Sequence, residues 1–453
     1  MTLLVQKYGG SSLTDLSKLE AIARKIKRYA DAGYQLVVVL SAMQGETDRL
    51  IQHANYMNHE HQSREYDALL ATGEQITTSM MAMALQHLGV NAKSLNAHQA
   101  GIHSDGKYSR SVIQHVDREA ILGLVRQKVV PVITGFQGIG NQGSTTTLGR
   151  GGSDITAVAV AASIGADECQ IFVDVNGVCT ADPKIERNAS IIHRIPAHIM
   201  LEAAAHGAKV IHKRAVVCAK RHAVTVRVCS THQEGPGTMI LNHHQQALIE
   251  ATEVMAITHD YRQVVLTLAF GVTDTAKHNC SHTGHMPQVQ DGQTEKTVEA
   301  PDVLARCIDD IQALLGALNQ SGLEIIHEIK TSSSKQTNLI LTMNESDHQL
   351  FKQVSANWFE QNGMNVAVTM LQNKARVSLI GHLLSRDLMV TSQVLAICQR
   401  ANIKLWHLSA SDHRISLTVD TAQVEWLVRA CHDCFIISKS NTGSDEKISM
   451  TIV

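Results

Sequence analysis

Apolar residues near the start of the chain alternate between short continuous runs and helical spacing. Residues 3–7 predict a short apolar strand, and residues 36–40 are a continuous aliphatic run of the kind that is buried on both faces of a parallel sheet. Apolar residues at helical intervals between them predict an amphipathic helix, and Ser17 and Glu20 have the spacing of a capping box. A glycine turn at residues 9–10 separates the first run from this helix. The order strand, turn, helix, strand predicts a right-handed βαβ unit.

The same two patterns continue through the rest of the chain. Further strands are predicted at residues 129–134, 169–175 and 224–229, and further helices begin near residues 73, 155 and 200. Beyond residue 250 the order changes to strand, helix, strand, strand. The clearer copy has strands at residues 375–380, 403–407 and 415–419 and a helix at residues 390–400. This change predicts an α/β domain followed by smaller α+β modules.

Length and composition restrict the class of protein. At 453 residues the chain exceeds one ordinary hydrophobic core, so two or three domains are expected. A net charge of −2 and an aromatic content of 4% disfavour nucleic-acid binding, and no apolar run is long enough to cross a bilayer. No export signal is visible, and nine scattered cysteines suit free thiols in a reducing compartment. We therefore predict a cytoplasmic protein with no nucleic-acid partner and no membrane partner.

Residues 143–154 form the segment that is richest in candidate chemistry, with four glycines and five hydroxyl side chains. A glycine-rich loop that runs into a helix is an anion site, because free N–H groups and the helix dipole both point toward it. Arg150 offers a planar fork for a carboxylate or phosphate. Asp154 can cap the helix or orient cationic side chains over a ligand. The alternative is a solvated turn, which the density of polar groups disfavours.

Lys7 lies at the end of the first strand, two positions before the first glycine of the turn. Neither the P-loop spacing nor the dinucleotide-binding fingerprint is present. Glycines let backbone N–H groups face phosphate oxygens while a lysine supplies a point charge. A surface lysine at a strand edge is the alternative.

Three further polar residues follow predicted strand ends or helix starts. Ser41 and Thr47 come after the second strand, at the end where α/β sheets bind ligands. The alternative is an N-cap at Thr47 or Asp48. Glu74 supplies a carboxylate suited to an ammonium group, or it is a first-turn glutamate favoured by the helix dipole.

Three blocks with matching order and spacing resemble the aspartate kinases of the amino acid kinase family over residues 1 to about 240. They are Thr145-Thr146-Thr147-Leu148-Gly149-Arg150-Gly151-Gly152-Ser153-Asp154, Lys7-Tyr8-Gly9-Gly10-Ser11-Ser12, and Val173-Asp174-Val175-Asn176-Gly177 with Thr180-Ala181-Asp182-Pro183-Lys184. The resemblance implies the α/β amino acid kinase fold, a central mostly parallel sheet sandwiched by helices, over residues 1–245. Two α+β ACT-like (βαββαβ) domains are expected to follow. The first covers residues 253–370 plus 446–453 with a polar insertion at 271–300, and the second covers residues 374–440.

The resemblance implies ATP-dependent phosphorylation of the β-carboxylate of L-aspartate to 4-phospho-L-aspartate, the first step toward lysine and threonine. ATP and Mg²⁺ are the expected cofactors, with the ion held mainly by the nucleotide and no protein metal site. The implied catalytic residues are Lys7, Asp154 and Lys209. The implied aspartate-binding residues are Ser41, Thr47, Glu74, Arg150 and Ser153. The implied nucleotide-binding residues are Lys7, Gly9, Gly10, Val173, Asp174, Cys179, Lys184, Lys209 and Val210.

Two other functions stay open at this point. One is another amino acid kinase activity, on glutamate, carbamate or a nucleoside phosphate, which the Arg150 block and the paired modules disfavour. The other is a catalytically silent amino-acid sensor, which has no need of Lys7, Arg150, Asp154 and Lys209 together.

Several positions depart from the family pattern. Cys179 stands where tyrosine is usual, Lys184 where arginine is usual, and Lys213 where proline is usual. In the second ACT-like domain, residues 383–390 lack the glycine that gives an effector access to the backbone. We therefore expect a homodimer joined through the ACT-like sheets, in which a lysine or threonine effector inhibits weakly or not at all.

Two groups of metal-type side chains need a separate interpretation. They are His278, Cys280, His282 and His285 in the polar insertion, and Cys431-His432-Asp433-Cys434 in a helical stretch. Neither group has a partner pair at the usual zinc spacing, so we interpret both as non-metal segments.

Overall fold

The computed structural model describes residues 1–57, 63–242, 253–271, 300–321, 323, 325–333, 336–362 and 366–438. The chain forms two compact units. The first unit is Met1–His259, Val377–Leu417 and Glu425–Val453, and the second is Asp260–Arg376 and Thr418–Val424. The predicted three-domain division stays a prediction. Most of the predicted polar insertion and the predicted return of the C-terminal tail lie outside the described residues.

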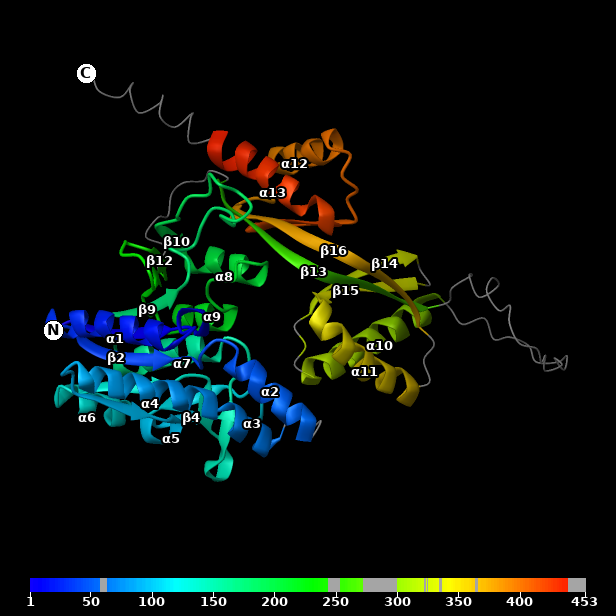
Figure 1. The fold of residues 1–453 in the computed structure, drawn as a ribbon. Helices are drawn as coiled ribbons and strands as arrows, with labels where there is room; N and C mark the ends of the chain where they lie inside the picture. Colours follow the sequence, from blue (N-terminus) through cyan, green and yellow to red (C-terminus); the bar gives the residue numbers. More distant parts are fainter. Residues whose placement is uncertain are drawn as a thin grey trace, which may run out of the picture. The chain divides into compact units, whose positions relative to one another are not determined.

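The first unit is built on an eight-stranded sheet with the strand order β10-β12-β11-β9-β1-β2-β6-β3. Figure 1 labels β2, β9, β10 and β12 of this sheet. Its strands are β1 (Leu3–Tyr8), β2 (Gln35–Leu40), β3 (Ala92–Leu95), β6 (Val130–Thr134), β9 (Glu168–Val173), β10 (Arg194–Pro196), β11 (Val226–Ser230) and β12 (Thr238–Leu241). Every neighbouring pair is parallel except β11 with β12. The predicted mostly parallel sheet is therefore confirmed.

Alternate residues of the central strands enter two separate hydrophobic cores. Val5, Val37 and Val39 belong to one core together with residues of α6, α7, α8 and α9. Leu4 and Val38 belong to the other core together with residues of α1 and α4. Strands that are covered on both faces need apolar residues at every position, which explains the continuous aliphatic runs in the sequence. The helices are α1 (Leu16–Asp31), α2 (Glu46–Met57), α3 (Arg64–Leu70), α4 (Thr72–His87), α5 (Ala97–Ala100), α6 (Arg118–Arg126), α7 (Gly152–Ile164), α8 (Ala197–Ala205) and α9 (Lys213–Arg221).

A second, four-stranded sheet carries part of the glycine- and hydroxyl-rich segment. Its order is β5-β4-β7-β8, and its strands are β4 (Ile102–Ser104), β5 (Ile113–Val116), β7 (Gln137–Ile139) and β8 (Thr145–Thr147). β7 and β8 pair antiparallel with Gly138 opposite Thr146. The threonine run therefore forms a strand that leads to the start of α7.

The C-terminal part repeats the predicted strand-helix-strand-strand order. The elements are β13 (Glu253–Gly271), α10 (Ala300–Ser321), β14 (Ile326–Ser333), β15 (Gln336–Asn344), α11 (Glu345–Gln361), β16 (Ala367–His382), α12 (Leu388–Arg400), β17 (His407–Ser411), β18 (Arg414–Asp420) and α13 (Val424–His432). The six strands form one sheet in the order β14-β15-β13-β16-β18-β17. This order of elements agrees with the predicted pair of α+β modules.

Two local predictions from the sequence are wrong. Asp15 caps α1 by accepting the Lys18 backbone N–H at 3.0 Å, so Ser17 lies inside the helix and its hydroxyl donates to Asp15. The strand predicted from residue 403 begins at His407, because the Ile403 N–H donates to the Cys398 carbonyl at the end of α12.

Two findings concern the predictions on membranes and thiols. Within the part of the chain that the structure covers, no helix has the length and apolar character needed to span a membrane. The eight described cysteines are free thiols.

Candidate active site

Four adjacent parallel strands end at one edge of the eight-stranded sheet. They are β9, β1, β2 and β6, which neighbour one another in that order. Asp174 follows β9, Gly9 follows β1 and Ser41 follows β2. The Ser41 N–H donates to the Tyr8 carbonyl at 3.1 Å, which extends the pairing past the strand end. Since parallel strands share the same carboxyl edge, these predicted site residues are brought to one edge.

Lys7 and Asp154 form an ion pair at this edge. Nζ of Lys7 lies 2.6 Å from Oδ1 of Asp154, and the two side chains are only 9% and 12% exposed. The second carboxylate oxygen accepts the His212 backbone N–H at 3.2 Å. α7 begins at Gly152 with Gly151 as its N-cap, so Asp154 lies in the first turn of α7. The capping alternative for Asp154 is therefore wrong, and the carboxylate instead orients a lysine.

Two glycines allow the backbone to pass close to this pair. A Cβ atom on Gly9 would lie 3.1 Å from Nζ of Lys7, so a side chain there would crowd the ammonium group. Gly151 has a φ of 69°, and a Cβ atom there would lie 2.2 Å from Cγ of His212. Both positions therefore favour glycine, one for space and the other for space and backbone conformation.

Glu74 is a buried carboxylate in the first turn of α4. Its Oε1 accepts the Ala42 backbone N–H at 3.0 Å, while its Oε2 is buried without a hydrogen bond from any described residue. Burial raises the pKa of Glu74 to about 7, against the lowering effect of the Ala42 hydrogen bond. An acid with an unsatisfied buried oxygen beside the Ser41 loop is suited to a cationic ligand group.

Two residues that the sequence analysis missed hold the glycine-rich segment. The buried carboxylate of Asp67 accepts the backbone N–H of Thr147 at 2.6 Å and that of Ser109 at 2.8 Å. The hydroxyls of both residues also donate to Asp67. Burial raises the pKa of Asp67, and these four hydrogen bonds oppose the rise. Arg214 donates to the carbonyls of Leu148 and Ser111, so α9 supports the same segment.

The remaining predicted aspartate-binding and phosphate-binding residues differ in exposure. Arg150 and Lys209 are exposed, Thr47 is half-buried and Ser153 is buried. Thr47 lies in the first turn of α2, which begins at Glu46. Their shared role in one site stays a prediction.

Among the predicted nucleotide-binding residues, Val173 ends β9, and Asp174, Cys179, Lys184 and Val210 lie outside the named helices and strands. The Val173 carbonyl accepts the Thr231 N–H at 2.8 Å, and Asp174 is exposed. Cys179 pairs with Ile191 in an isolated bridge, and burial raises the pKa of its thiol. The exposed Lys184 donates its backbone N–H to Asp182. Val210, near the start of α9, is half-buried. No ligand-binding geometry is defined by these contacts, so the nucleotide assignments stay predictions.

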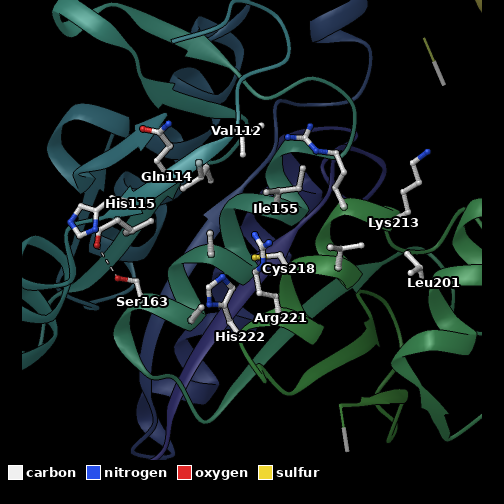
Figure 2. A pocket seen from close by; sticks show the side chains of 16 residues that line it. Val112, Gln114, His115, Ile155, Ser163, Leu201, Lys213, Cys218, Arg221 and His222 are labelled. Atoms are coloured by element: carbon white, nitrogen blue, oxygen red, sulfur yellow. Dashed lines mark hydrogen bonds between the residues drawn. The ribbon is translucent and has the colours of Figure 1, made fainter. Parts of the chain in front are cut away.

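A cavity of about 560 Å³ is lined by residues of β5, α7, α8 and α9. Figure 2 shows the side chains that line it. Ile155, Ser163, Leu201 and Cys218 are among its lining residues, and Ser163 donates to the Val116 carbonyl at 2.9 Å. None of the predicted site residues is among the described residues that line it. Burial raises the pKa of the Cys218 thiol, which makes it a poor nucleophile. This cavity is therefore separate from the site at the strand ends.

Comparison with known proteins first defines the class to which this fold and site belong. A family model described as "Amino acid kinase family" matches residues 2–230. The sequence is 33% identical over 435 residues to the "Aspartate kinase Ask_LysC" of Stutzerimonas stutzeri, covering 96% of this chain and 97% of that protein. The chain therefore belongs to the aspartate kinases within the amino acid kinase family.

Two solved structures of E. coli aspartokinase III share the fold. The form in complex with aspartate and ADP (R-state) has a TM-score of 0.70 and 22% identity, covering 95% of this chain and 99% of that chain. The form in complex with lysine and aspartate (T-state) has a TM-score of 0.65 and 22% identity, covering 96% and 99%.

Proposed function

We propose that the chain transfers the γ-phosphoryl group of ATP to the β-carboxylate of L-aspartate, forming 4-phospho-L-aspartate. The observation that carries this proposal is the buried Lys7–Asp154 pair, whose charged atoms lie 2.6 Å apart at the strand ends. Similarity to aspartate kinases over nearly the full length supports the reaction, as does the complex of E. coli aspartokinase III with aspartate and ADP. The same similarity disfavours a different acceptor and a silent sensor.

The reaction requires positive charge at a fixed place more than it requires a base. The β-carboxylate is already ionised at neutral pH, so no proton has to be removed from the nucleophile. The obstacle is the approach of two anions, which positioning and charge neutralisation overcome. Asp154 holds the Lys7 ammonium before substrate binds, and low exposure strengthens its effect on a transferring phosphoryl group.

Lys209 is the second phosphate-binding lysine in this proposal. Asp154 accepts the His212 N–H, three positions after Lys209, and so fixes the segment that carries it. Exposure of Lys209 leaves its long side chain room to reach a bound nucleotide. Asp154 is thus a positioning residue for both lysines.

Aspartate recognition is assigned to groups of opposite charge. Arg150 takes the α-carboxylate in a bidentate pair, and Glu74 takes the α-ammonium group. Burial raises the pKa of Glu74 to about 7, and a bound ammonium group would favour its carboxylate form. Ser41, Thr47 and Ser153 add polar contacts.

The nucleotide is assigned to the glycine turn and to the segments after β9 and α8. Gly9 and Gly10 present backbone N–H groups to phosphates, as in other phosphate-binding turns. The remaining assigned contacts are Val173, Asp174, Cys179, Lys184 and Val210. Mg²⁺ bound with ATP would neutralise phosphate charge. Because Asp154 is paired with Lys7, we expect phosphate oxygens and water, rather than Asp154, to be the ligands of Mg²⁺.

Regulation is proposed to be weak. We infer a homodimer that forms through the ACT-like sheets. E. coli aspartokinase III has been solved in complex with lysine and aspartate (T-state), whereas we expect lysine to inhibit this chain weakly or not at all. Leu383 has a φ of 54°, and the adjacent Leu384 is completely buried. Larger side chains thus stand where a glycine would leave room for an effector.

A hydroxamate assay with purified protein, ATP and Mg²⁺ tests the reaction. Hydroxylamine traps an acyl phosphate, so colour should form with L-aspartate and should be absent with L-glutamate or without ATP. Equal colour with another acidic amino acid would change the assigned substrate. No colour with any acidic amino acid would favour a catalytically silent amino-acid sensor.

A further inference from the structure

Three histidines that are distant in the sequence converge within the first unit. His198 lies in α8, His382 is the last residue of β16, and His413 lies between β17 and β18. Each side chain is half-buried, and one ring nitrogen from each lies within 4.8 Å of the other two. The rings of His382 and His413 are stacked with centroids 5.4 Å apart, and the His198 ring centroid lies 4.7 Å from that of His413. This trio is defined here as the three-histidine cluster.

The backbone holds two of these histidines in register. The Gly381 N–H donates to the His413 carbonyl at 3.1 Å, and the Leu384 N–H donates to the Asp412 carbonyl at 2.9 Å. The Nδ1 atoms of His382 and His413 are shielded from solvent and have no hydrogen bond from any described residue. Buried ring nitrogens are normally satisfied, so these two atoms point to a missing partner.

The partner that fits three converging imidazoles is a divalent transition-metal ion. Zn²⁺ binds histidine nitrogen at about 2.0–2.1 Å in a tetrahedral frame, which sets neighbouring ligand nitrogens about 3.3 Å apart. Nitrogens within 4.8 Å reach that spacing by small ring rotations. Three histidines with a fourth position for water form a recognised zinc ligand set, and imidazole suits Zn²⁺ better than Mg²⁺ or Ca²⁺.

Nearby charges are compatible with a bound cation. Asp412, next to His413, accepts a hydrogen bond from the Ser385 hydroxyl, and its Oδ2 lies 3.9 Å from Nη2 of Arg386. Its carboxylate therefore opposes the charge of an ion held by these rings. Arg414 is directed to His206, where its Nη1 lies 2.5 Å from Nε2. Its guanidinium is thus engaged with a histidine outside the cluster.

We infer that the three-histidine cluster binds one Zn²⁺ ion, which fastens α8 to the end of β16 and to the β17–β18 turn. α8 ends at Ala205, shortly before Lys209, so the ion would join the C-terminal segment to the stretch that carries the second phosphate-binding lysine. This site is independent of the kinase reaction, and its test does not require turnover. Residues 383–390, the loop without the glycine that would give an effector access to the backbone, start directly after His382. The Zn²⁺ site therefore lies beside this loop.

Metal binding to the full-length protein provides the test. Protein stripped with EDTA is titrated with Zn²⁺ against a chromophoric chelator, and in parallel with Co²⁺ while visible spectra are recorded. Wild-type protein should bind about one Zn²⁺ tightly through this cluster and show the intense visible bands of four-coordinate Co²⁺. His413→Gln and His382→Gln should each weaken that affinity at least ~100-fold and abolish the bands.

Two double variants serve as controls. His103→Ala/His115→Ala removes a surface pair whose ring centroids are 6.0 Å apart, and it should bind Zn²⁺ like wild-type protein. His282→Ala/His285→Ala removes two candidate ligands from the polar insertion, and it should keep the Co²⁺ bands. Bands that survive in His413→Gln and vanish in His282→Ala/His285→Ala would overturn the inference, as would wild-type protein with no bands.

A second measurement covers variants with altered folding. The circular dichroism spectrum of metal-free His413→Gln should match that of metal-free wild-type protein. If the spectra differ, the metal titration is repeated with His198→Gln. Zn²⁺ should slow amide exchange in α8 and in the β17–β18 turn of wild-type protein only. Unchanged exchange in wild-type protein with Zn²⁺ present would contradict the inference.

Discussion

Two lysine–aspartate pairs in this chain have the same length and different surroundings. In the first unit, Lys7 Nζ lies 2.6 Å from Asp154 Oδ1, and in the second unit Lys374 Nζ lies 2.6 Å from Asp420 Oδ1. Lys374 is in β16 and Asp420 ends β18, and these strands are neighbours in the six-stranded sheet. That second pair joins two strands that already pair through their backbones.

The difference lies in what surrounds each pair. Lys7 and Asp154 come from a strand end and a helix first turn, beside a glycine at which a Cβ atom would lie 3.1 Å from the ammonium nitrogen. Asp154 has a side-chain exposure of 12%, whereas Asp420 has an exposure of 40%. A short ion pair is therefore no sign of catalysis by itself. Position at converging strand ends, an adjacent glycine and low exposure distinguish the proposed catalytic pair.

The largest expected effect is the loss of turnover in Asp154→Ala. Without the carboxylate, the Lys7 ammonium is neither held nor balanced, so kcat should fall at least ~10³-fold, which corresponds to about 4 kcal/mol in the barrier. The hydroxamate assay measures kcat, and circular dichroism checks that the fold is retained. Retention of more than a tenth of the wild-type kcat would remove Asp154 from the mechanism.

Asp420→Ala is the matched control for that variant. It breaks an equally short lysine–aspartate pair, and a partly exposed pair contributes roughly 1 kcal/mol or less to stability. Its kcat should stay within ~2-fold of wild-type. A comparable loss of turnover in both variants would erase the distinction between the two pairs.

Arg150→Lys should damage the use of aspartate more than the use of ATP. A lysine cannot reproduce the bidentate fork, so kcat/KM for aspartate should fall by about 1.5–3 kcal/mol, or ~10–150-fold. Arg227→Lys is the control, because Arg227 already donates two hydrogen bonds to Glu168 in a structural pair. A raised KM for ATP with unchanged aspartate kinetics would reassign Arg150 to the nucleotide.

Glu74→Gln should change how stability depends on pH. The folded-state pKa of about 7 lies above the ordinary 4.5, so the wild-type protein loses stability as pH rises from about 4.5 to about 7. Glutamine can still accept the Ala42 N–H and carries no charge, so above pH 7 the variant should be more stable by about 3 kcal/mol. Thermal unfolding without substrate measures this difference, which should vanish near pH 4.5. Parallel curves at all pH values would refute the raised pKa.

The smallest expected effect is that of lysine and threonine on activity. The loop at residues 383–390 offers no glycine, and Leu384 is buried. An inhibitor shifts the active state only by its differential affinity, so a closed loop should leave activity nearly unchanged. Titrations with each amino acid, alone and together, measure this. Half-inhibition at ~10 μM or below implies a site worth roughly −7 kcal/mol and would contradict the expectation.

The strand-end part of the site was predictable because the signals are local in the sequence. Continuous apolar runs identify buried parallel strands, and the residues that follow them must meet at one edge. Lys7, Gly9 and Ser41 could therefore be grouped before any coordinates were known. The family blocks then supplied expectations for Arg150 and Lys209, whose contacts with ligands stay predictions.

The supports of the site were not predictable, because they join distant segments. Asp67 accepts a hydrogen bond from Thr147, which is 80 positions away, and Arg214 donates one to Ser111, which is 103 positions away. No periodicity or spacing connects such residues. The predicted N-cap of α1 was wrong for a different reason. Asp15 and Ser17 are both good N-cap residues, and only the backbone conformation at the start of α1 selects Asp15. The three-histidine cluster likewise arises from three distant segments.

A double-mutant cycle on Lys7 and Asp154 tests the central claim most directly. Lys7→Met, Asp154→Asn and the double variant are compared with wild-type protein by kcat/KM for aspartate. If Asp154 acts largely by holding Lys7, the loss in the double variant should be smaller than the sum of the two single losses, with a coupling energy of about 1–3 kcal/mol. Losses that simply add would mean that the two residues act independently, and the account of a preassembled charge pair would be wrong.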